Sequence, residues 1–360
     1  MDQGKVRLAP GEQFWFEHYN FLASRGYRLR SRYDPTHVSL RFLGVHRRCY
    51  QVEGYEDEVP TVVSRPVCSN GVCGSRHIQR PSLVDAVRAD GTLCVLRRTK
   101  TWSDEIPVLQ HTRRCKDERN RVVPILDIVP LPSDDDTALI VMPLLRLFYD
   151  PPFSRASEVI DAVGQFMQCL QFLHENLVAH RDFCTYNLMM DASRLIPGGF
   201  HFSETRRPPD AATFGLKYRD RSHVSPMKYY VADFGLCTRL PNRHSRVTGV
   251  YGQDKTVPEL SWDIPYDPFK VDIYQFGNVI LKDLIAAYYD GLDFLRPLGD
   301  MMTRASPDER PTIDEALRVF EDLVASLPKS KFNRRLEWDR EHRLGVVDRV
   351  RCCSNVMCIC

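Results

Sequence analysis

The sequence HRDFCTYN at residues 180–187 and the sequence DFG at residues 233–235 decide the expected fold and site of this chain. Asp182 supplies a carboxylate that can orient an attacking hydroxyl group and accept its proton. Asp233 and the side-chain carbonyl of Asn187 supply the oxygen ligands that a hard cation such as Mg²⁺ prefers. Together the two stretches contain the residue types that proton transfer and the binding of a hard cation require.

In this order, the two stretches resemble the H-R-D-x-x-x-x-N and D-F-G motifs of eukaryotic-type protein kinases. The resemblance covers roughly residues 81–328. It implies an α+β, bilobal kinase-like fold with a small, mostly β N-lobe and a large, mostly α C-lobe, and with ATP and Mg²⁺ between them. It also implies catalytic roles for Asp182, Asn187 and Arg181, and metal-binding roles for Asn187 and Asp233. Arg181 would pair with a phosphate group on the segment that follows Asp233.

Three further positions resemble protein kinases more than other phosphotransferases of related fold. Val257-Pro258-Glu259 resembles the Ala-Pro-Glu motif that ends the activation segment. Asp272 stands where the family's central helix begins, and the resemblance implies that it holds the catalytic loop backbone. Arg310 stands where the family has the partner of the Ala-Pro-Glu glutamate, so we expect a buried Glu259–Arg310 ion pair. Losing one member of such a pair typically costs about 3–5 kcal/mol.

The part of the chain before residue 150 matches the family less closely. The sequence CVLR at residues 94–97 aligns with the V-A-I-K motif, which puts Arg97 at the position of the phosphate-binding lysine. The resemblance makes Glu105 the partner of that side chain, and makes Met142 (the gatekeeper) and Leu145 hinge residues beside the cofactor. The alternative is that Arg97 is a surface arginine, because strand register is weakly determined by sequence.

The chain departs from the family pattern in ways that bear on activity. Residues 80–88 contain no glycine, so the glycine-rich loop that lets backbone amides approach phosphates is absent. Arg97 keeps the positive charge, but its planar fork does not replace a compact ammonium group. Lys100 cannot substitute, because its odd spacing from Arg97 points it to the opposite strand face. Cys184 and Gly252 stand where Ser/Thr kinases usually have a lysine and a threonine, so these positions leave the choice between Ser/Thr and Tyr open. The expected type is Ser/Thr.

Periodicity predicts a strand-rich region followed by a helical one. In the strand-rich region we expect a short helix over 10–26, strands over 83–87 and 92–98 around an Asp90-Gly91 turn, and strands over 122–129 and 138–142. A helix over 102–113, with a capping box at Thr101, lies between the two pairs of strands. In the helical region we expect a helix with an apolar stripe (Val159, Val163, Phe166, Leu170 and Leu173) and helices over 272–287 and 312–327.

These elements suggest three consecutive parts of the chain. Residues 1–80 form an N-terminal extension lying on the main domain, and residues 329–360 form a charged, cysteine-rich tail. Residues 81–328 form the kinase domain. Within it, we expect an N-lobe over 81–148, a C-lobe over 149–328 and an inserted loop over about 191–230.

Composition argues against several classes of partner. The net charge of +2 gives no reason to expect nucleic acid or a charged membrane surface. The N-terminus lacks the apolar core of a signal peptide, and no run approaches the roughly 18 apolar residues of a membrane-spanning helix. The twelve cysteines are expected to be reduced thiols, and the tail unmodified. We expect an intracellular protein, cytoplasmic or nuclear, with a protein substrate; oligomeric state is not indicated.

Three functions compete on the sequence. The leading expectation is an ATP-dependent protein kinase, because Asp182, Asn187 and Asp233 are all present. A pseudokinase that binds nucleotide or acts as a scaffold is the alternative, because of Arg97 and the absent glycine loop. A small-molecule kinase of related fold is the third. The long insert and the N-terminal Phe14-Trp15 helix further resemble a divergent group of kinase-domain proteins from basidiomycete fungi.

Overall fold

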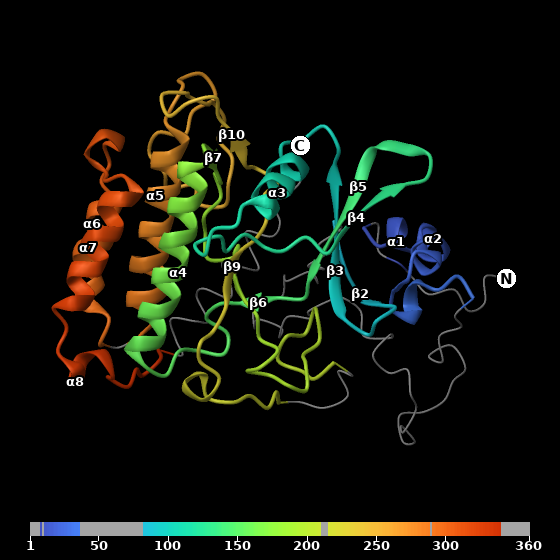
Figure 1. Ribbon diagram of the computed structural model, residues 1–360, viewed down its shortest axis with the longest axis horizontal. Coiled ribbons are helices and arrows are strands. Elements are labelled where there is room, and N and C mark those ends of the chain that lie inside the picture. The colour runs from blue at the N-terminus through green and yellow to red at the C-terminus, as the bar shows by residue number, and fades with distance from the viewer. Residues whose placement is uncertain (1–7, 9–10, 37–81, 210–214, 289, 340–360) are drawn as a thin grey trace, which may run out of the picture.

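The computed structural model describes residue 8 and residues 11–36, 82–209, 215–288 and 290–339. The expectations for most of the N-terminal extension and for the cysteine-rich tail lie outside these residues. Within them the chain is α+β: an antiparallel sheet with three flanking helices lies beside a part built mainly from helices (Figure 1). None of the described helices is long and apolar enough to cross a membrane.

The main sheet has five antiparallel strands in the order β1-β2-β3-β5-β4. Its strands are β1 Tyr27–Arg28, β2 Leu83–Arg88, β3 Leu93–Lys100, β4 Asp127–Leu131 and β5 Asp134–Pro143. The predicted β2–β3 hairpin is confirmed, and Gly91 adopts a φ of 83° in its turn. The sequence did not predict β1, because two residues are too few to show a period. The predicted strand over 122–129 is only partly correct, since β4 begins at Asp127.

The two faces of the sheet pack against different partners. On one face, Cys94 and Leu96 of β3 are fully buried in an apolar cluster that also contains Trp15 and Leu22 of the N-terminal helices. Arg97 has the opposite parity on β3 and therefore points to the other face, toward the helical part. Lys100 shares the parity of Cys94, which is opposite to that of Arg97 as expected, and its side chain is exposed.

The N-terminal helix forms as two pieces, α1 Gln13–Glu17 and α2 Tyr19–Ser24, rather than the single helix expected over 10–26. The break falls at His18, whose φ and ψ are −97° and 6°. His18 Nδ1 lies 2.8 Å from the Phe14 carbonyl oxygen, so the ring interacts with the backbone at the end of α1. Trp15 of α1 and Leu22 of α2 are both buried in the apolar cluster that packs on the sheet.

Helix α3 Glu105–Arg114 lies between the sheet and the helical part (Figure 1). It begins three residues later than expected, and the capping box predicted at Thr101 is wrong. Thr101 Oγ1 donates instead to the Asp135 carbonyl oxygen at 2.7 Å, and the N-cap residue Asp104 makes no side-chain cap. Tertiary contact with the start of β5 has therefore replaced the local cap.

The helical part has a continuous apolar core. Its α-helices are α4 Ala156–Glu175, α5 Pro268–Asn278, α6 Arg296–Met302, α7 Ile313–Ala325 and α8 Lys329–Phe332. Its shorter helical turns are η4 Arg221–His223, η5 Val279–Leu284, η6 Ile285–Ala287, η7 Asp293–Leu295 and η8 Pro307–Glu309. A further turn, η1 Ser31–Tyr33, lies near the sheet. All five residues of the predicted α4 stripe are buried. The helix expected over 272–287 begins earlier, at Pro268, and ends as the π and 3-10 turns η5 and η6. Thr312 caps α7 in a capping box with Glu315.

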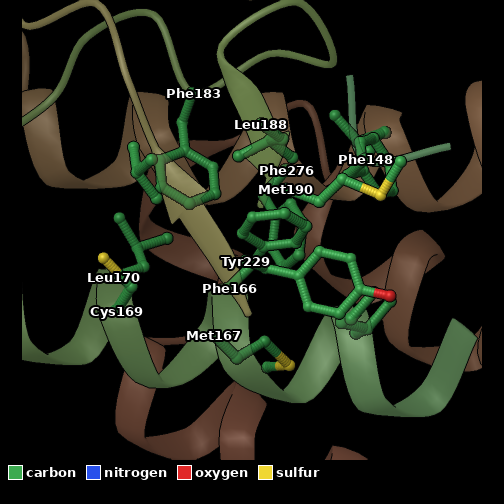
Figure 2. Close-up of a cluster of buried hydrophobic side chains, with 14 of the residues drawn as sticks. Phe148, Phe166, Met167, Cys169, Leu170, Phe183, Leu188, Met190, Tyr229 and Phe276 are labelled. Atoms are coloured by element: carbon green, nitrogen blue, oxygen red, sulfur yellow. The ribbon is translucent and has the colours of Figure 1, made fainter. Parts of the chain in front are cut away.

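Short strands connect this core to the candidate site. Strands β6 Arg146–Leu147, β8 Leu188–Met190 and β9 Tyr229–Val231 form one sheet, and β7 Val178–Ala179 pairs with β10 Thr238–Arg239. Figure 2 shows Leu188, Met190 and Tyr229 packed with Phe166 of α4. The loops that follow β7 and β9 are thereby fixed on α4.

The segment over 191–230 lacks regular structure among its described residues, apart from η4 and the start of β9, as expected for an insert. It is nevertheless anchored in the core by Arg221. The Arg221 guanidinium donates to the carbonyl oxygens of Phe148 at 2.9 Å and Pro151 at 2.6 Å, and lies 4.4 Å from the centre of the Phe153 ring. The insert is thus packed against the helical part.

Candidate active site

The loop over 180–187 is held by side chains of helix α5. Asp272 is fully buried, and its two carboxylate oxygens accept from the backbone N–H groups of His180 at 2.9 Å and Arg181 at 2.6 Å. One helical turn later, Gln275 Oε1 accepts from the Phe183 N–H at 2.8 Å, and Gln275 Nε2 donates to the Arg181 carbonyl oxygen at 3.2 Å. The expected contact of Asp272 with this loop is therefore present, and Gln275 extends it.

Asp182 and Asn187 form one hydrogen-bonded unit inside this loop. Asn187 Nδ2 donates to the Asp182 backbone oxygen at 2.8 Å and to Asp182 Oδ2 at 3.0 Å. The N–H of Gln253 donates to Asp182 Oδ1 at 2.8 Å, and the side chain is almost wholly buried. Burial raises the pKa of the Asp182 carboxyl, the Gln253 N–H partly offsets the rise, and the negative charge of Asp233 adds to it.

Asp233 lies at the start of the second loop, with a φ of 61°. The Ala232 N–H donates to the Asn187 carbonyl oxygen at 2.8 Å, so the two loops lie side by side. Phe234 is buried, with its ring centre 4.8 Å from that of His180. Burial raises the pKa of Asp233, but the charges of Arg97 and His180, together with hydrogen bonds from the Gly235 N–H and from Arg97, outweigh burial and lower the net pKa.

Arg97 links the sheet, α3 and the second loop. Its Nε lies 2.8 Å from Glu105 Oε1, and its Nη2 lies 2.7 Å from Asp233 Oδ1. Glu105 is buried and also accepts from Thr99 Oγ1 at 2.5 Å. The Arg97 side chain is only 14% exposed, so the alternative of a surface arginine is wrong. We call Arg97 with Glu105 and Asp233 the Arg97 bridge.

Gly235 makes room for this bridge. A Cβ atom added at Gly235 would lie 2.5 Å from Arg97 Nη2, closer than real Cβ atoms approach a neighbour. Any larger residue would therefore have to displace the guanidinium. The position of the Arg97 guanidinium therefore depends on the absence of a side chain at Gly235.

Met142 and Leu145 lie where the chain passes from the sheet to the helical part. Met142 is buried near the end of β5, beside Val95 of β3 in the strand register. Leu145 follows β5 and is partly buried against the main core. The contacts that join Asp182, Asn187, Asp233, Arg97 and Glu105 do not include these two residues.

Arg181 makes contacts with the segment after Asp233. Arg181 Nη1 donates to Thr238 Oγ1 at 3.1 Å, and Nη2 donates to the Thr248 carbonyl oxygen at 3.2 Å. Its guanidinium carbon lies 5.3 Å from the centre of the Tyr251 ring. The role expected for Arg181 in pairing with a phosphate stays a prediction.

The expected Glu259–Arg310 ion pair is confirmed. Arg310 Nη1 and Nη2 donate to the two Glu259 carboxylate oxygens at 2.5 Å and 2.8 Å. The Arg310 side chain is fully buried, and it also donates to the carbonyl oxygens of Arg304, Lys270 and Ala305. This pair fixes the segment that carries Gln253 against the helical part.

The sequence did not predict the contacts of Gln253 and Gln275 with the loop, nor that of Thr99 with Glu105. Gln275 could have been found, because it stands three residues after Asp272 and therefore on the same helix face. Gln253 acts through its backbone, which leaves no trace in residue type. Its neighbour Gly252 has a φ of 82°, and a Cβ there would lie 2.8 Å from the Arg181 carbonyl oxygen. A glycine at 252 permits this close approach.

The donor set suits a cation that is bound together with phosphate groups. Asn187 uses its Nδ2 for Asp182, which leaves its carbonyl Oδ1 as the ligand atom. Asp233 Oδ1 is paired with Arg97, which leaves Oδ2. Within the described part of the chain no cluster of three His, Cys, Asp or Glu side chains could hold a metal ion alone. One carboxylate and one amide fit Mg²⁺, which takes few protein ligands and completes its shell with phosphate and water.

Comparison with known proteins gives one partial similarity. No family model matches the chain. A "Light-sensor Protein kinase" from Ceratodon purpureus is 28% identical over 137 residues, which is 37% of this chain and 10% of that protein. The match thus spans only about a tenth of that relative's length. It indicates a kinase-like relationship.

Proposed function

We propose that this chain is an ATP-dependent protein kinase with a bilobal kinase fold, transferring a phosphoryl group to a protein hydroxyl. The observation that supports this most is the single hydrogen-bonded unit of Asp182 and Asn187 beside Asp233, held on α5 by Asp272. Separate chance motifs would have no reason to meet in one place. The partial similarity to a kinase-named protein agrees with the proposal.

Each residue of the unit has a distinct task in this proposal. Asp182 orients the substrate hydroxyl and accepts its proton. Asn187 and Asp233 hold Mg²⁺, which neutralises the charge of the phosphates when it is bound. Arg97, Glu105, Met142 and Leu145 form the ATP side of the site.

The acceptor is proposed to be a protein rather than a small molecule. The Glu259–Arg310 pair and the contact of the Gln253 N–H with Asp182 fix the segment over 248–259 beside Asp182. In this proposal, an extended polypeptide substrate lies along that segment. We propose a Ser/Thr acceptor, an intracellular location, and a relationship to the divergent basidiomycete kinase-domain group. Phosphoamino-acid analysis of a labelled product tests the acceptor type.

The second candidate is a pseudokinase, which specific contacts favour. Arg97 shares its charge with two carboxylates, and Asp182 Oδ1 already accepts from Gln253. Residues 80–88 also contain no glycine. Such a chain would bind nucleotide without transferring phosphate.

Two measurements on the same proteins separate these functions. Phosphate transfer is followed with labelled ATP, and ATP binding is followed by the melting shift with Mg²⁺-ATP. At 100 times Kd the binding should stabilise the fold by about 2.7 kcal/mol. A kinase loses transfer in Asp182→Asn but keeps the melting shift. A pseudokinase shows the shift without transfer in the unaltered chain.

The metal assignment has its own control. Asp233→Ala should lose most of the shift with Mg²⁺-ATP, whereas Asp300→Ala, at an exposed position on α6, should keep it. Equal shifts in the unaltered protein and Asp233→Ala would show that the metal assignment is wrong. No shift in any protein, together with no transfer, would overturn both candidate functions.

A further inference from the structure

The loop that follows Glu259 presents two large apolar side chains to solvent. Trp262 is 61% exposed and Ile264 is 71% exposed, and only one residue separates them in the chain. Exposed apolar residues scattered singly are ordinary, whereas those that occur together mark interaction surfaces. We call Trp262 and Ile264 the apolar pair.

Hydrogen bonds give this loop a defined backbone. Ser261 Oγ accepts from the backbone N–H groups of Asp263 at 3.2 Å and Ile264 at 3.0 Å. The Ser261 carbonyl oxygen accepts from the Gly249 N–H at 2.6 Å, and the Tyr266 hydroxyl donates to the Gly249 carbonyl oxygen at 2.5 Å. The apolar pair is therefore attached to the segment over 248–259, and a partner that binds it has little loop ordering to offset.

Trp262 is also connected to the candidate active site through side chains. Its ring centre lies 5.1 Å from that of Tyr251, with the two rings at 81°. The Tyr251 ring centre in turn lies 5.3 Å from the guanidinium carbon of Arg181, the residue before Asp182. The Trp262 ring is thus within about 10 Å of that carbon, a distance that an extended chain covers in roughly three residues.

This continuity indicates which partner the apolar pair meets. The Gln253 N–H contacts Asp182, so a hydroxyl group presented to Asp182 lies beside the segment over 248–259. A peptide that extends outward along that segment reaches the apolar pair within about five residues. A second copy of the chain has no comparable reason to bind beside Asp182, so the observations favour the polypeptide substrate.

We propose that the apolar pair binds an apolar side chain of the polypeptide substrate, about three to five residues from the hydroxyl group that accepts the phosphate. The inference rests on the proposed function and deepens it by naming a substrate class. Leu, Ile, Met and Phe suit the position, because the rigid indole of Trp262 offers them a large contact area. A charged side chain is disfavoured there, because its lost hydration has no compensating partner.

The test compares peptides that differ at one position. Each peptide carries a central Ser, Thr or Tyr with five residues on either side. One flanking position is fixed as Leu, Ala, Asp or Lys, and the others are mixed. Phosphate transfer from labelled ATP is measured with the full, unaltered chain. At one position about three to five residues from the centre, kcat/KM should be about tenfold higher for the Leu peptide than for the Ala peptide.

Variants of the apolar pair assign that preference to its residues. Trp262→Ala and Ile264→Ala should each bring the Leu-to-Ala ratio toward one, because the apolar contact is lost. Ile264→Lys should exchange the preference for Leu with a preference for Asp at the same position, because the new charge attracts a carboxylate. Trp102→Ala removes another exposed indole, between β3 and α3, and should keep the tenfold ratio.

Three outcomes would contradict the proposal. Transfer without a Leu preference at any position, or a ratio unchanged in both Trp262→Ala and Ile264→Ala, would overturn the role of the apolar pair and leave the proposed function in place. Light scattering that shows a dimer in the unaltered chain and a monomer in Trp262→Ala would assign the pair to self-association instead. Absence of transfer to every peptide would overturn the proposed protein kinase function and this inference with it.

Discussion

At the scale of single residues, Asp182 is a buried acid beside a second carboxylate. Its environment disfavours the charged form, because water is excluded and Asp233 repels a second negative charge. The backbone N–H of Gln253 and the amide of Asn187 compensate in part. An acid with a raised pKa is a stronger proton acceptor once ionised, which suits the role proposed for Asp182.

The raised pKa of Asp182 predicts a pH dependence of phosphate transfer. The ordinary pKa of Asp is about 3.9, and the rate should fall as pH drops through a value above this, because a protonated carboxyl cannot accept a proton. Initial rates at saturating Mg²⁺-ATP, measured between about pH 4 and 8, check this. Gln253→Ala keeps the backbone N–H, so its rate of phosphate transfer should fall over the same pH range as that of the unaltered protein. A rate that stays constant down to the ordinary Asp range would contradict the prediction.

At the scale of secondary structure, helix α5 positions the site and packs tightly on α6. Asp272 and Gln275 hold the loop over 180–187, while Gly277, two residues later, faces α6. A Cβ at Gly277 would lie 2.8 Å from Met302 Cβ, an atom next to the backbone that cannot move aside. The close approach of the two helices therefore depends on glycine.

Gly277→Ala should destabilise the protein. Alanine favours a helix by about 0.8–1.0 kcal/mol over glycine, but overpacking at this contact should cost about 1–3 kcal/mol and prevail. Denaturant unfolding measures the difference. Gly164→Ala, within α4, is the matched control, because its Cβ would meet Phe320 at an ordinary 3.4 Å. That variant should be neutral or stabilising, and a stabilised Gly277→Ala would show that α6 can shift.

At the scale of the whole molecule, two apolar clusters lie on opposite faces of one sheet. The larger joins the inner face to the helical part, and the smaller holds α1 and α2 against the outer face. Trp15 is the largest fully buried side chain of the described residues and lies in the smaller cluster. Together with β1, this packing makes the N-terminal helices a structural part of the sheet.

Trp15→Ala should therefore lower the stability of the whole fold. Truncating a buried Trp costs about 3–5 kcal/mol, because apolar contact is lost and a cavity remains. Thermal and denaturant unfolding check the size of the loss. Trp102→Ala is the control, because Trp102 is 73% exposed and its loss should change stability by less than about 0.5 kcal/mol. Equal stability of both variants would show that α1 and α2 contribute nothing to the fold.

The sequence alone determined the features that depend on local patterns. The stripe of α4, the hairpin at Asp90-Gly91 and the capped start of α7 follow from residue types at fixed spacing, and the structure contains all three. The pairing of Glu259 with Arg310 and the contact of Asp272 with the loop were also predicted, because distinctive motifs mark both ends.

Tertiary structure decided the features that depend on contacts between distant residues. The break at His18 and the two-residue strand β1 leave no periodic pattern in the sequence. Both become evident only from the packing of this segment against the sheet. The contact of Gln253 with Asp182 uses a backbone N–H that every residue except proline has. Arg97 can be shared between Glu105 and Asp233 only once β3, α3 and the DFG loop have come together. The chain contains many other charged residues, and no local pattern shows which of them will pair.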